Sequence, residues 1–542
     1  MRAVLFASLV LIAVFPAASR ADDPGQKFFD EAVSLRFEAD SLRKLTDVIE
    51  LCDKALEAGM TGENKTFCEG FLASALVERG TQLARPVMTG VPTDVQQAQQ
   101  LLRLRDLAQK DLERAVQLSP DSIEGQFLLG RLQALPGGDK KKAVDALSAA
   151  IKLAEDEPAL RAKALTARAE ISDDDAQRKA DYNAAVEASP GDLEARSARA
   201  TFRLQHEDAQ GALDDVNAAL EDAEDDEAPA LFELKGLALA NLKKFAEAEA
   251  AFTKTIEAAP GAPASYFYRA RARLLKGDGQ AALDDINKTL TLIPTQPEVL
   301  LLRAGAYQQL GKSSEALADV DAALKLDPDM QEAIRARATL LAGNGKLAEA
   351  IGDLERLREG ETRDVRTLLQ LGMLYYTNGQ IKQAIDAFGA ILKQDPKNAL
   401  AYQARADARL RVGDHAGARQ DYEESLKYER DNTHVLNNLA WLLATSPENS
   451  VRSGKQAIEL ATKACELTEY KQAHILSTLA AGYAEAGDFA SAIKWSTKAV
   501  EQGKEDGQIS EQLEAELKSY QAGKPWREKQ TLEEEPKPES PQ

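Results

Sequence analysis

A period of 34 residues runs through the middle of this 542-residue sequence. Three series of residues keep the period, with one position skipped among the prolines: Gly277, Gly311, Gly345, Gly379 and Gly413; Ala248, Ala282, Ala316, Ala350, Ala384 and Ala418; and Pro260, Pro294, Pro328 and Pro396. Aromatic residues make up only 6% of the chain, and Ala and Leu are plentiful, which favours closely packed helices over strands. A fixed period of this length is typical of stacked arrays in which each repeat buries its apolar face against its neighbours. The period therefore predicts an all-α array of helical hairpins.

Within each repeat the sequence has the anatomy of two antiparallel helices. Small residues stand twelve positions before the alanines, where two helix backbones need to approach closely: Gly236, Ala270, Ala304, Ala338, Gly372 and Ala406. Large residues stand near the end of the second helix: Phe252, Phe388 and Tyr422. This pattern resembles the tetratricopeptide repeat (TPR), and weaker copies cover most of the chain. The resemblance implies an all-α, right-handed superhelical solenoid of about 12–13 TPR helix-turn-helix repeats, closed by a C-terminal capping helix.

Departures from the period divide the chain into segments. Repeats are expected to begin near 122, 158, 192 and 228, and then every 34 residues to about 430. The expected segments are 22–119, divergent TPR-like helices with an inserted loop at Pro86–Pro92; 120–259, degenerate repeats; 260–430, regular repeats; 431–505, C-terminal repeats; 506–528, the capping helix; and 529–542, a disordered tail. The tail is assigned on its polar, charged and Pro-rich composition.

The N-terminus has the features of a secretory signal peptide. Arg2 precedes an apolar run from Ala3 to Phe15 that is too short to span a bilayer, and small residues around Arg20 offer a cleavage site after Ala21. We therefore expect residues 1–21 to be a cleaved signal peptide. The mature protein is expected to be exported, periplasmic or extracellular, without insertion into a membrane.

Charge and motif spacing narrow the classes of function. The formal net charge is −21, which repels phosphate backbones and argues against nucleic acid as a partner. The four histidines are scattered, the acidic run 221–227 lacks the glycine of a calcium loop, and the glycines of 305–313 miss the P-loop spacing by one residue. We therefore expect no cofactor, no metal site and no catalytic residue. Cys52 and Cys68 form a disulfide or are separate packing thiols, and the sequence leaves that choice open.

Arginine and aspartate are also in register along the array. The Arg precedes the small residue of the first helix and the Asp follows sixteen positions later: Arg199 and Asp215, Arg269 and Asp285, Arg303 and Asp319, Arg337 and Asp353, Arg405 and Asp421. Two repeats have Lys235 and Leu371 in place of the Arg, and both also lack the Asp. Because the two residues occur together or not at all, we expect a partly buried ion pair that links the two helices of a repeat. Asp285 and its neighbour Asp284 are thus not expected to be a catalytic pair.

The resemblance also implies a binding surface, because the first helices of TPR arrays line a concave groove. The inward positions of this sequence would be Phe267, Arg271, Gln308, Gln309, Arg335, Arg366, Met373, Tyr376, Gln403, Asp407, Arg411, His434, Asn437 and Trp441. Amides in such a strip can bond to the backbone of an extended peptide, and arginines favour acidic side chains. An inner face that meets only solvent is equally compatible with these residues.

The function that the resemblance implies is that of an exported, non-catalytic scaffold. Its partner would be a protein or an extended, acidic peptide held in the concave groove, and its role would be assembly of an envelope complex. The alternative is a self-associating structural repeat protein of the cell envelope. An enzyme with its site within residues 22–120 is a third reading. The sequence leaves the partner's identity and the oligomeric state open.

Overall fold

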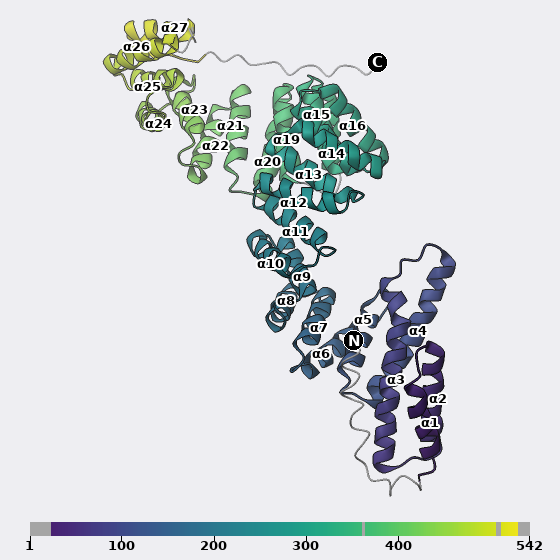
Figure 1. The fold of residues 1–542 in the computed structure, drawn as a ribbon. Helices are drawn as coiled ribbons and strands as arrows, with labels where there is room; N and C mark the ends of the chain where they lie inside the picture. The colour runs from purple at the N-terminus through teal and green to yellow at the C-terminus, as the bar shows by residue number, and fades with distance from the viewer. Residues whose placement is uncertain (1–22, 360–363, 506–510, 529–542) are drawn as a thin grey trace. The chain divides into compact units, whose positions relative to one another are not determined.

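The computed structural model of the protein describes residues 23–359, 364–505 and 511–528. In these ranges the chain forms twenty-seven α-helices and no strand (Figure 1), which confirms the all-α class. The expected signal peptide, residues 1–21, and the expected tail, residues 529–542, lie outside the described residues. The chain divides into a first part, Met1–Asp278, and a second part, Gly279–Gln542, and each is described by itself.

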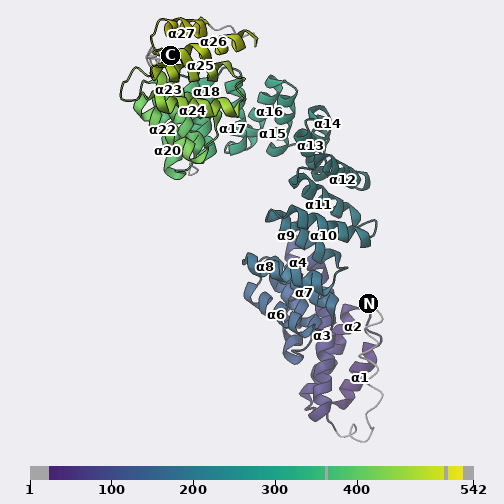
Figure 2. The same ribbon diagram turned by 90° about the vertical axis from the view of Figure 1, so that its left-hand side faces the viewer.

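The first part is a series of helical hairpins. Consecutive helices pack in pairs, from α1 with α2 to α11 with α12, and each pair packs on the next (Figures 1 and 2). Only α3 and α4 are much longer than the rest, with 28 and 24 residues. The helices are α1 (Gln26–Arg36), α2 (Leu42–Glu57), α3 (Gly62–Thr89), α4 (Val95–Leu118), α5 (Ile123–Ala134), α6 (Lys140–Leu153), α7 (Pro158–Ile171), α8 (Asp175–Ala188), α9 (Leu193–Gln205), α10 (Ala209–Asp222), α11 (Ala228–Asn241), α12 (Phe245–Ala258) and α13 (Pro263–Lys276).

The second part repeats the same arrangement. Helices α15 to α26 form six consecutive pairs, and α27 packs on α26 at the C-terminal end, where the capping helix is expected. The helices are α14 (Gly279–Leu292), α15 (Pro297–Gln309), α16 (Ser313–Leu326), α17 (Gln331–Gly343), α18 (Leu347–Glu359), α19 (Val365–Thr377), α20 (Ile381–Gln394), α21 (Ala399–Arg411), α22 (His415–Tyr428), α23 (Thr433–Thr445), α24 (Gly454–Leu467), α25 (Ala473–Glu485), α26 (Phe489–Glu505) and α27 (Glu511–Gln521). The handedness of the array stays a prediction. Within the described ranges, no helix combines the length and the apolar character needed to cross a lipid bilayer.

A left-handed residue reverses the chain between the two helices of a repeat. The glycines of the 34-residue series all have φ between +71° and +94°: Gly277, Gly311, Gly345, Gly379 and Gly413. After this turn the backbone N–H of Lys312 donates to the carbonyl oxygen of Tyr307 at 2.9 Å and closes the end of α15. Glu207 and Lys243 take the same place in two earlier repeats, with φ of +61° and +60°. The degenerate repeats therefore keep the turn, although it is less favourable for a residue with a side chain.

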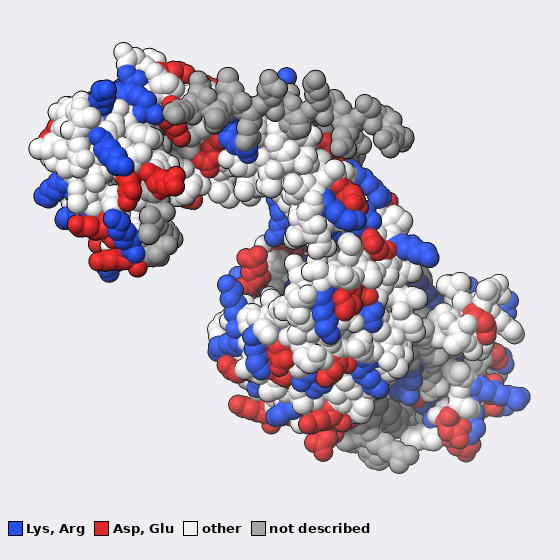
Figure 3. Space-filling view, turned by 90° about the horizontal axis from the view of Figure 1, so that it is seen from above, with Lys and Arg blue, Asp and Glu red and all other residues white. Residues whose placement is uncertain are grey.

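Positively and negatively charged side chains are interspersed on the face shown in Figure 3, and arginine and aspartate also pair inside the repeats. Four of the expected arginine–aspartate pairs have guanidinium Nε and Nη2 both donating to the carboxylate, at 2.5–2.9 Å: Arg199–Asp215, Arg303–Asp319, Arg337–Asp353 and Arg405–Asp421. These aspartates are buried, and their arginines are partly buried. Such two-point contacts between charged groups are stronger and more directional than single hydrogen bonds. Arg269 and Asp285 belong to different parts of the chain, so that pair stays a prediction.

The same arginines also reach back to the preceding repeat. Nη1 of Arg303 donates to Asn287 Oδ1 at 3.2 Å, and Nη1 of Arg337 donates to Asp321 Oδ1 at 3.2 Å. The equivalent bonds in the first part are Arg199 to Asn183 and Arg269 to Thr253. One guanidinium therefore joins the two helices of its own repeat to the second helix of the repeat before it.

Two further pairs of this kind have a spacing other than sixteen. Arg168 donates to both oxygens of Asp181 at 2.7 and 2.9 Å, and Arg79 donates to both oxygens of Asp111 at 2.7 Å. Asp181 has the same place in α8 as Asp215 has in α10, but its arginine lies nearer the end of the first helix. Arg79 and Asp111 lie on α3 and α4, whose greater length adds residues between them.

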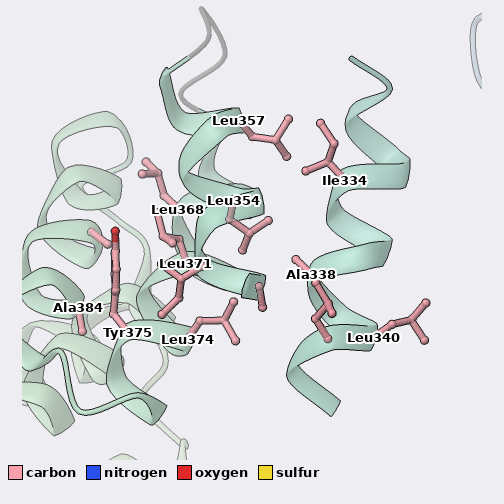
Figure 4. Close-up of a cluster of buried hydrophobic side chains, with 14 of the residues drawn as sticks. Ile334, Ala338, Leu340, Leu354, Leu357, Leu368, Leu371, Leu374, Tyr375 and Ala384 are labelled. Carbon is pink, nitrogen blue, oxygen red and sulfur yellow. The ribbon is translucent and has the colours of Figure 1, made fainter. Parts of the chain in front are cut away.

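Small and large residues are matched where the two helices of a repeat touch. A Cβ added at Gly236 would lie 2.4 Å from Phe252 Cε1, and one added at Gly372 would lie 2.5 Å from Phe388 Cε1. Where the second helix has an aliphatic side chain instead, as in α17 and α18, the first helix has alanine. Figure 4 shows side chains of α17, α18 and α19 meeting in one apolar cluster of this kind. The size of one residue therefore sets the size of the other, because protein interiors are close-packed.

The loop expected at Pro86–Pro92 begins later than predicted. Helix α3 continues through Pro86 to Thr89. Proline prevents one backbone hydrogen bond and disfavours a helix. Here Val87 and Met88 pack against the cluster around Leu83 and Leu112, and this burial holds the last turn of α3 in place.

The capping helix expected over 506–528 is also shorter than predicted. Within the described residues, α27 ends at Gln521, and Gly523 follows with φ of +67°. Pro525 disfavours helical conformation at the residue before it, so the chain continues without helical structure to residue 528.

The three cysteines are buried and free. Cys68 lies on α3 with its Sγ 3.8 Å from the carbonyl oxygen of Cys52 on α2, so the two residues meet as packing thiols. Burial raises the pKa of the Cys465 thiol to about 12. Buried thiols of this kind remain protonated and unreactive at neutral pH.

Candidate peptide-binding surface

The first helices of neighbouring repeats are linked by side-chain contacts in the second part. Gln370 Nε2 of α19 donates to Thr339 Oγ1 of α17 at 2.8 Å. Arg411 Nη1 of α21 donates to the carbonyl oxygen of Tyr376 in α19 at 3.3 Å. Polar side chains of α21 also bond to those of α23 (below). Helices α17, α19, α21 and α23 therefore lie side by side, and we call the side chains that they share between them the first-helix surface.

Arg411 and Tyr376 form the cationic part of this surface. The guanidinium carbon of Arg411 lies 5.0 Å from the centre of the Tyr376 ring, within the range of a cation–π contact. Both residues are partly buried. A guanidinium held by a ring and a carbonyl loses little further freedom when it binds a carboxylate, since its position is already set.

A group of neutral hydrogen-bonding side chains lies about two helical turns from Arg411, toward the start of α21 and α23. Gln403 Nε2 lies 3.3 Å from His434 Nδ1, and Gln403 Oε1 accepts from Asn432 Nδ2 at 3.3 Å. His434 is exposed, whereas Gln403 is partly buried. The Oδ1 atom of Asn437 is buried without a hydrogen-bond partner among the described residues. Amide and imidazole groups in this arrangement are suited to the backbone of an extended peptide.

Asp407 is hydrogen-bonded to other side chains of the protein. Its carboxylate accepts a short hydrogen bond from the Tyr422 hydroxyl and another from Asn438 Nδ2 at 3.4 Å. Burial raises the pKa of Asp407, and the hydrogen bond from Tyr422 opposes that rise. Asp407 therefore fixes α21 to α22 and α23. Sequence reasoning did not anticipate Asn438, because its position is outside the expected inward set.

Arg335 is likewise engaged within the protein. Its guanidinium lies 3.3 Å from Asp364 Oδ2 and 3.2 Å from Glu332 Oε1, and its side chain is only 15% exposed. Nη1 is also 3.4 Å from Thr367 Oγ1. Two carboxylates therefore balance the charge of Arg335, and this weakens its attraction for an acidic ligand.

The remaining expected residues are distributed around these contacts. Arg366, Gln308 and Gln309 are exposed, and Met373 is half exposed. Trp441 is partly buried against an apolar cluster of α21 to α26. In the first part, Phe267 packs edge-on against Tyr268, and Arg271 is exposed: their relation to the first-helix surface is not determined. The structure thus brings Arg411 to Tyr376 and Gln403 to His434, and it bonds Asp407 to neighbours on α22 and α23.

A metal site was also sought among the described residues. Within the described ranges, no group of three His, Cys, Asp or Glu side chains is arranged to hold a metal ion. A shallow cavity of about 320 Å³ lies elsewhere, in the first part, between the turns that contain Leu135 and Ser172. The first-helix surface is open and has the character of a binding surface.

A protein of stacked helical hairpins with such a surface belongs to the class of helical-repeat interaction scaffolds. Family models match residues 233–297, 301–363 and 369–435 to the tetratricopeptide repeat. These residues are therefore tetratricopeptide repeats, as the sequence pattern predicts. Tetratricopeptide repeats typically serve as non-catalytic scaffolds. No curated protein sequence matches the chain.

Several solved TPR structures are similar to parts of the chain. The C-terminal part of a TPR repeat-containing protein from Cytophaga hutchinsonii is 19% identical, and the match covers 44% of this chain and 96% of that one, with a TM-score of 0.39. A tetratricopeptide repeat protein from Parabacteroides merdae is 18% identical over 54% of this chain and 99% of its own, with a TM-score of 0.34. YrrB, described as a TPR protein with an unusual peptide-binding site, is 21% identical over 34% of this chain and 96% of its own, with a TM-score of 0.30.

Proposed function

We propose that the protein is a scaffold whose first-helix surface binds an extended, acidic segment of a partner protein. The observation that carries this proposal is Arg411, which is held on the Tyr376 ring at the end of α21, with the amide and imidazole of Gln403 and His434 near the other end of the same helices. Arg366 adds a second, exposed cation on α19. Charge-assisted bonds from arginine select carboxylates, and the neutral side chains suit a peptide backbone.

The proposal extends to the place where the scaffold acts. The apolar run from Ala3 to Phe15 and the small residues before Asp22 support export and cleavage near Ala21. An exported scaffold without a catalytic site would serve in the assembly of an envelope complex. Mass spectrometry of the purified mature protein tests the cleavage: an N-terminus at Asp22 is expected, and a retained Met1 would contradict it.

A peptide-binding measurement tests the surface. The probes are a labelled twelve-residue peptide with six glutamates and the matched peptide with glutamines, and binding is followed by fluorescence anisotropy at two salt concentrations. We expect the glutamate peptide to bind at least about ten-fold more tightly, because one ionic contact of about 1.4 kcal/mol already gives that factor. Added salt should weaken this binding.

Charge-reversal variants give the matched control. Arg366→Glu with Arg411→Glu removes the two cations of the first helices, and Lys382→Glu with Lys393→Glu makes the same charge change on exposed positions of the second helix α20. The first variant should lose at least about ten-fold in affinity for the glutamate peptide, and the second should lose much less. Equal losses would show that only net charge matters and would refute the surface.

Self-association is the second candidate function, and the tip of the α3–α4 hairpin favours it. Val91, Val95 and Leu102 are 85%, 75% and 59% exposed there. Exposed apolar groups that lie together mark interaction sites more often than isolated ones do. Self-association predicts a molar mass by light scattering above that of one chain, which falls in the Val91→Ser, Val95→Ser, Leu102→Ser variant; a monomer at all concentrations would exclude this function.

A further inference from the structure

A small polar cavity lies at the ends of two first helices in the first part of the chain. It has a volume of about 320 Å³ and lies between the turn that follows α5 and the turn that follows α7. This volume is at the lower end of the range for ligand pockets. The walls include the residues at which both helices end, 133–135 and 170–172. Carbonyl oxygens at a helix C-terminus have partial negative charge, so this place favours a cation.

The end of α5 shows which kind of cation suits a helix end in this part of the chain. The guanidinium of Arg105, from α4, donates to the carbonyl oxygens of Leu132 and Leu135 at 3.2 and 3.1 Å. It also donates to the carbonyl oxygen of Pro136 at 2.5 Å. An arginine from the preceding hairpin therefore covers the C-terminus of a first helix. The planar guanidinium has several donors in fixed directions, which lets one side chain bond to several carbonyl groups at once.

The acidic side chains of the cavity are Asp173 and Glu170. Asp173 forms an ion pair with Lys140, which also lines the cavity from the start of α6. Glu170 forms no ion pair with a described residue. It is accessible to solvent, yet partial burial raises the pKa of its carboxyl, and the nearby Glu194 carboxylate raises that pKa further, whereas Arg131 lowers it. A cation placed beside Glu170 would favour its charged form.

Gln133 adds a hydrogen-bond donor to the cavity wall. Its side chain is 3% exposed, and Oε1 accepts a hydrogen bond from the backbone N–H of Asp139 at 3.0 Å, which fixes the orientation of the amide. Nε2 is buried and has no hydrogen-bond partner among the described residues. Buried polar groups in native proteins are nearly always hydrogen-bonded, so this atom points to an acceptor from outside the chain. The carbonyl oxygen of a bound peptide is such an acceptor, and it meets Nε2 as the wall adjusts around the ligand.

We propose that this cavity binds an arginine side chain of a partner protein. The guanidinium pairs with Glu170 at the end of α7, and a carbonyl oxygen of the same peptide accepts from Gln133. The inference goes beyond the proposed function, because it concerns another part of the chain and a ligand of the opposite charge. The net charge of −21 favours the approach of such a basic segment.

Two peptides that differ in one charge test the proposal. The probe is a short, blocked and fluorescein-labelled peptide of glycine and serine with one arginine, and the control peptide has citrulline in its place. Binding to the full-length protein is followed by fluorescence anisotropy. Citrulline has nearly the shape of arginine but no charge, so the arginine peptide should bind about five-fold more tightly, the upper value for an accessible ion pair. Equal binding of the two peptides would overturn the proposal.

Two substitutions in the cavity should change the affinity in opposite directions. Glu170→Gln should weaken binding of the arginine peptide about five-fold, to the level of the citrulline peptide. Lys140→Gln releases Asp173 from its ion pair, so a second carboxylate can meet the guanidinium, and binding should strengthen at least about two-fold. Both side chains are accessible to solvent, so neither change disturbs the core.

Matched controls make the same charge changes away from the cavity. Glu187→Gln lies near the end of α8 and Lys152→Gln near the end of α6, both at exposed positions. Both variants should bind the arginine peptide like the wild type. A loss in Glu187→Gln equal to that in Glu170→Gln, or a gain in Lys152→Gln equal to that in Lys140→Gln, would show that only net charge matters and would overturn the site.

Free methylguanidinium distinguishes two sources of the same cation. It has the charged group of arginine but no carbonyl oxygen for Gln133. It should therefore displace the labelled peptide only at concentrations at least about ten-fold higher than the unlabelled peptide needs. Displacement by both competitors at equal concentrations would show that a small cation alone fills the cavity, and it would overturn the assignment to a partner protein.

Discussion

At the scale of single residues, one buried carboxylate joins the two helices of a repeat. Asp421 is 1% exposed and accepts hydrogen bonds from both Arg405 and Arg409, at 2.6–2.9 Å. Removing one partner of a buried ion pair leaves the other charge desolvated, and this typically costs about 3–5 kcal/mol. Where the arginine is partly exposed, as here, the loss is expected at the lower end of that range.

Asp421→Ala should therefore destabilise the protein by about 3 kcal/mol. The matched control is Asp386→Ala on α20, an exposed aspartate of a second helix, which should change the free energy of unfolding by less than about 0.5 kcal/mol. Denaturant titrations followed by circular dichroism measure both. If the two variants were equally stable, the ion pairs would have no role in holding the repeat together.

The register of arginine and aspartate shows what sequence can and cannot reveal at this scale. The spacing of sixteen identifies pairs in which both helices have standard length. This spacing does not reveal Arg168–Asp181, because Arg168 lies further along its helix. Nor does it reveal Arg79–Asp111, because these two residues lie on longer helices. The inward set likewise contains Asp407 and Arg335, whose internal partners are contributed by neighbouring helices and leave no periodic signal.

At the scale of secondary-structure elements, the fit between two helices depends on one small residue. Gly372 meets Phe388, and a Cβ at this glycine would lie 2.5 Å from a ring carbon. In this repeat Leu371 and Ala387 stand where most repeats of the series have arginine and aspartate. The contact between α19 and α20 therefore depends on apolar packing where other repeats add an ion pair.

Gly372→Ala should destabilise by about 1–3 kcal/mol, the usual range for an overpacked core. Phe388→Leu alone should also destabilise, because it leaves a void. The double variant should be more stable than the sum of the two effects predicts, by about 0.5–3 kcal/mol, since the new methyl group fills the vacated space. Thermal and urea unfolding of the four proteins complete the cycle, and strictly additive effects would contradict the matched contact.

The capping helix α27 contains a buried acid. Glu516 is 0% exposed and accepts hydrogen bonds from Ser477 and, at 2.8 Å, from Gln512. Burial raises the pKa of Glu516 above its ordinary 4.5, and the two hydrogen bonds oppose that rise. Because the folded state holds this proton more tightly than the unfolded state, the contribution of Glu516 is most favourable below pH 4.5 and is lost as the pH rises through the raised pKa.

Glu516→Gln should therefore make the cap more stable than in the wild type at pH 7–8 and remove that loss with rising pH. Hydrogen exchange of α27, corrected for the intrinsic rate at each pH, measures the effect. Glu511→Gln, at an exposed position of the same helix, should leave the wild-type profile unchanged. A wild-type cap whose protection is the same at pH 5 and pH 8 would contradict the account.

Element ends were less predictable than the elements themselves. The 34-residue period marks the left-handed turns and the close helix contacts, because both need small residues at fixed places. The period does not predict that α3 continues beyond Pro86, where the packing of Val87 and Met88 outweighs the effect of the proline. Nor does it indicate how the chain continues after α27, where Arg527 contacts residues 42 and 83 positions earlier in the chain.

At the scale of the whole molecule, each part is a succession of hairpins that contact mainly their neighbours. An array of this kind presents the same side of every first helix in turn, so a binding surface extends over several repeats. From the sequence, it is easier to predict which helices face a ligand than to predict which of their side chains are already bonded within the protein. Arg411 is expected to contribute because its guanidinium is already positioned by Tyr376, whereas Arg335 is bonded to Asp364 and Glu332 within the protein.

Hydrogen exchange across the whole protein, with and without the six-glutamate peptide, tests this surface most directly. The account predicts slower exchange in the first helices α17, α19, α21 and α23 on adding the peptide, with little change in the second helices α18, α20, α22 and α24. Protection confined to the second helices, or an unchanged exchange pattern at saturating peptide, would contradict it.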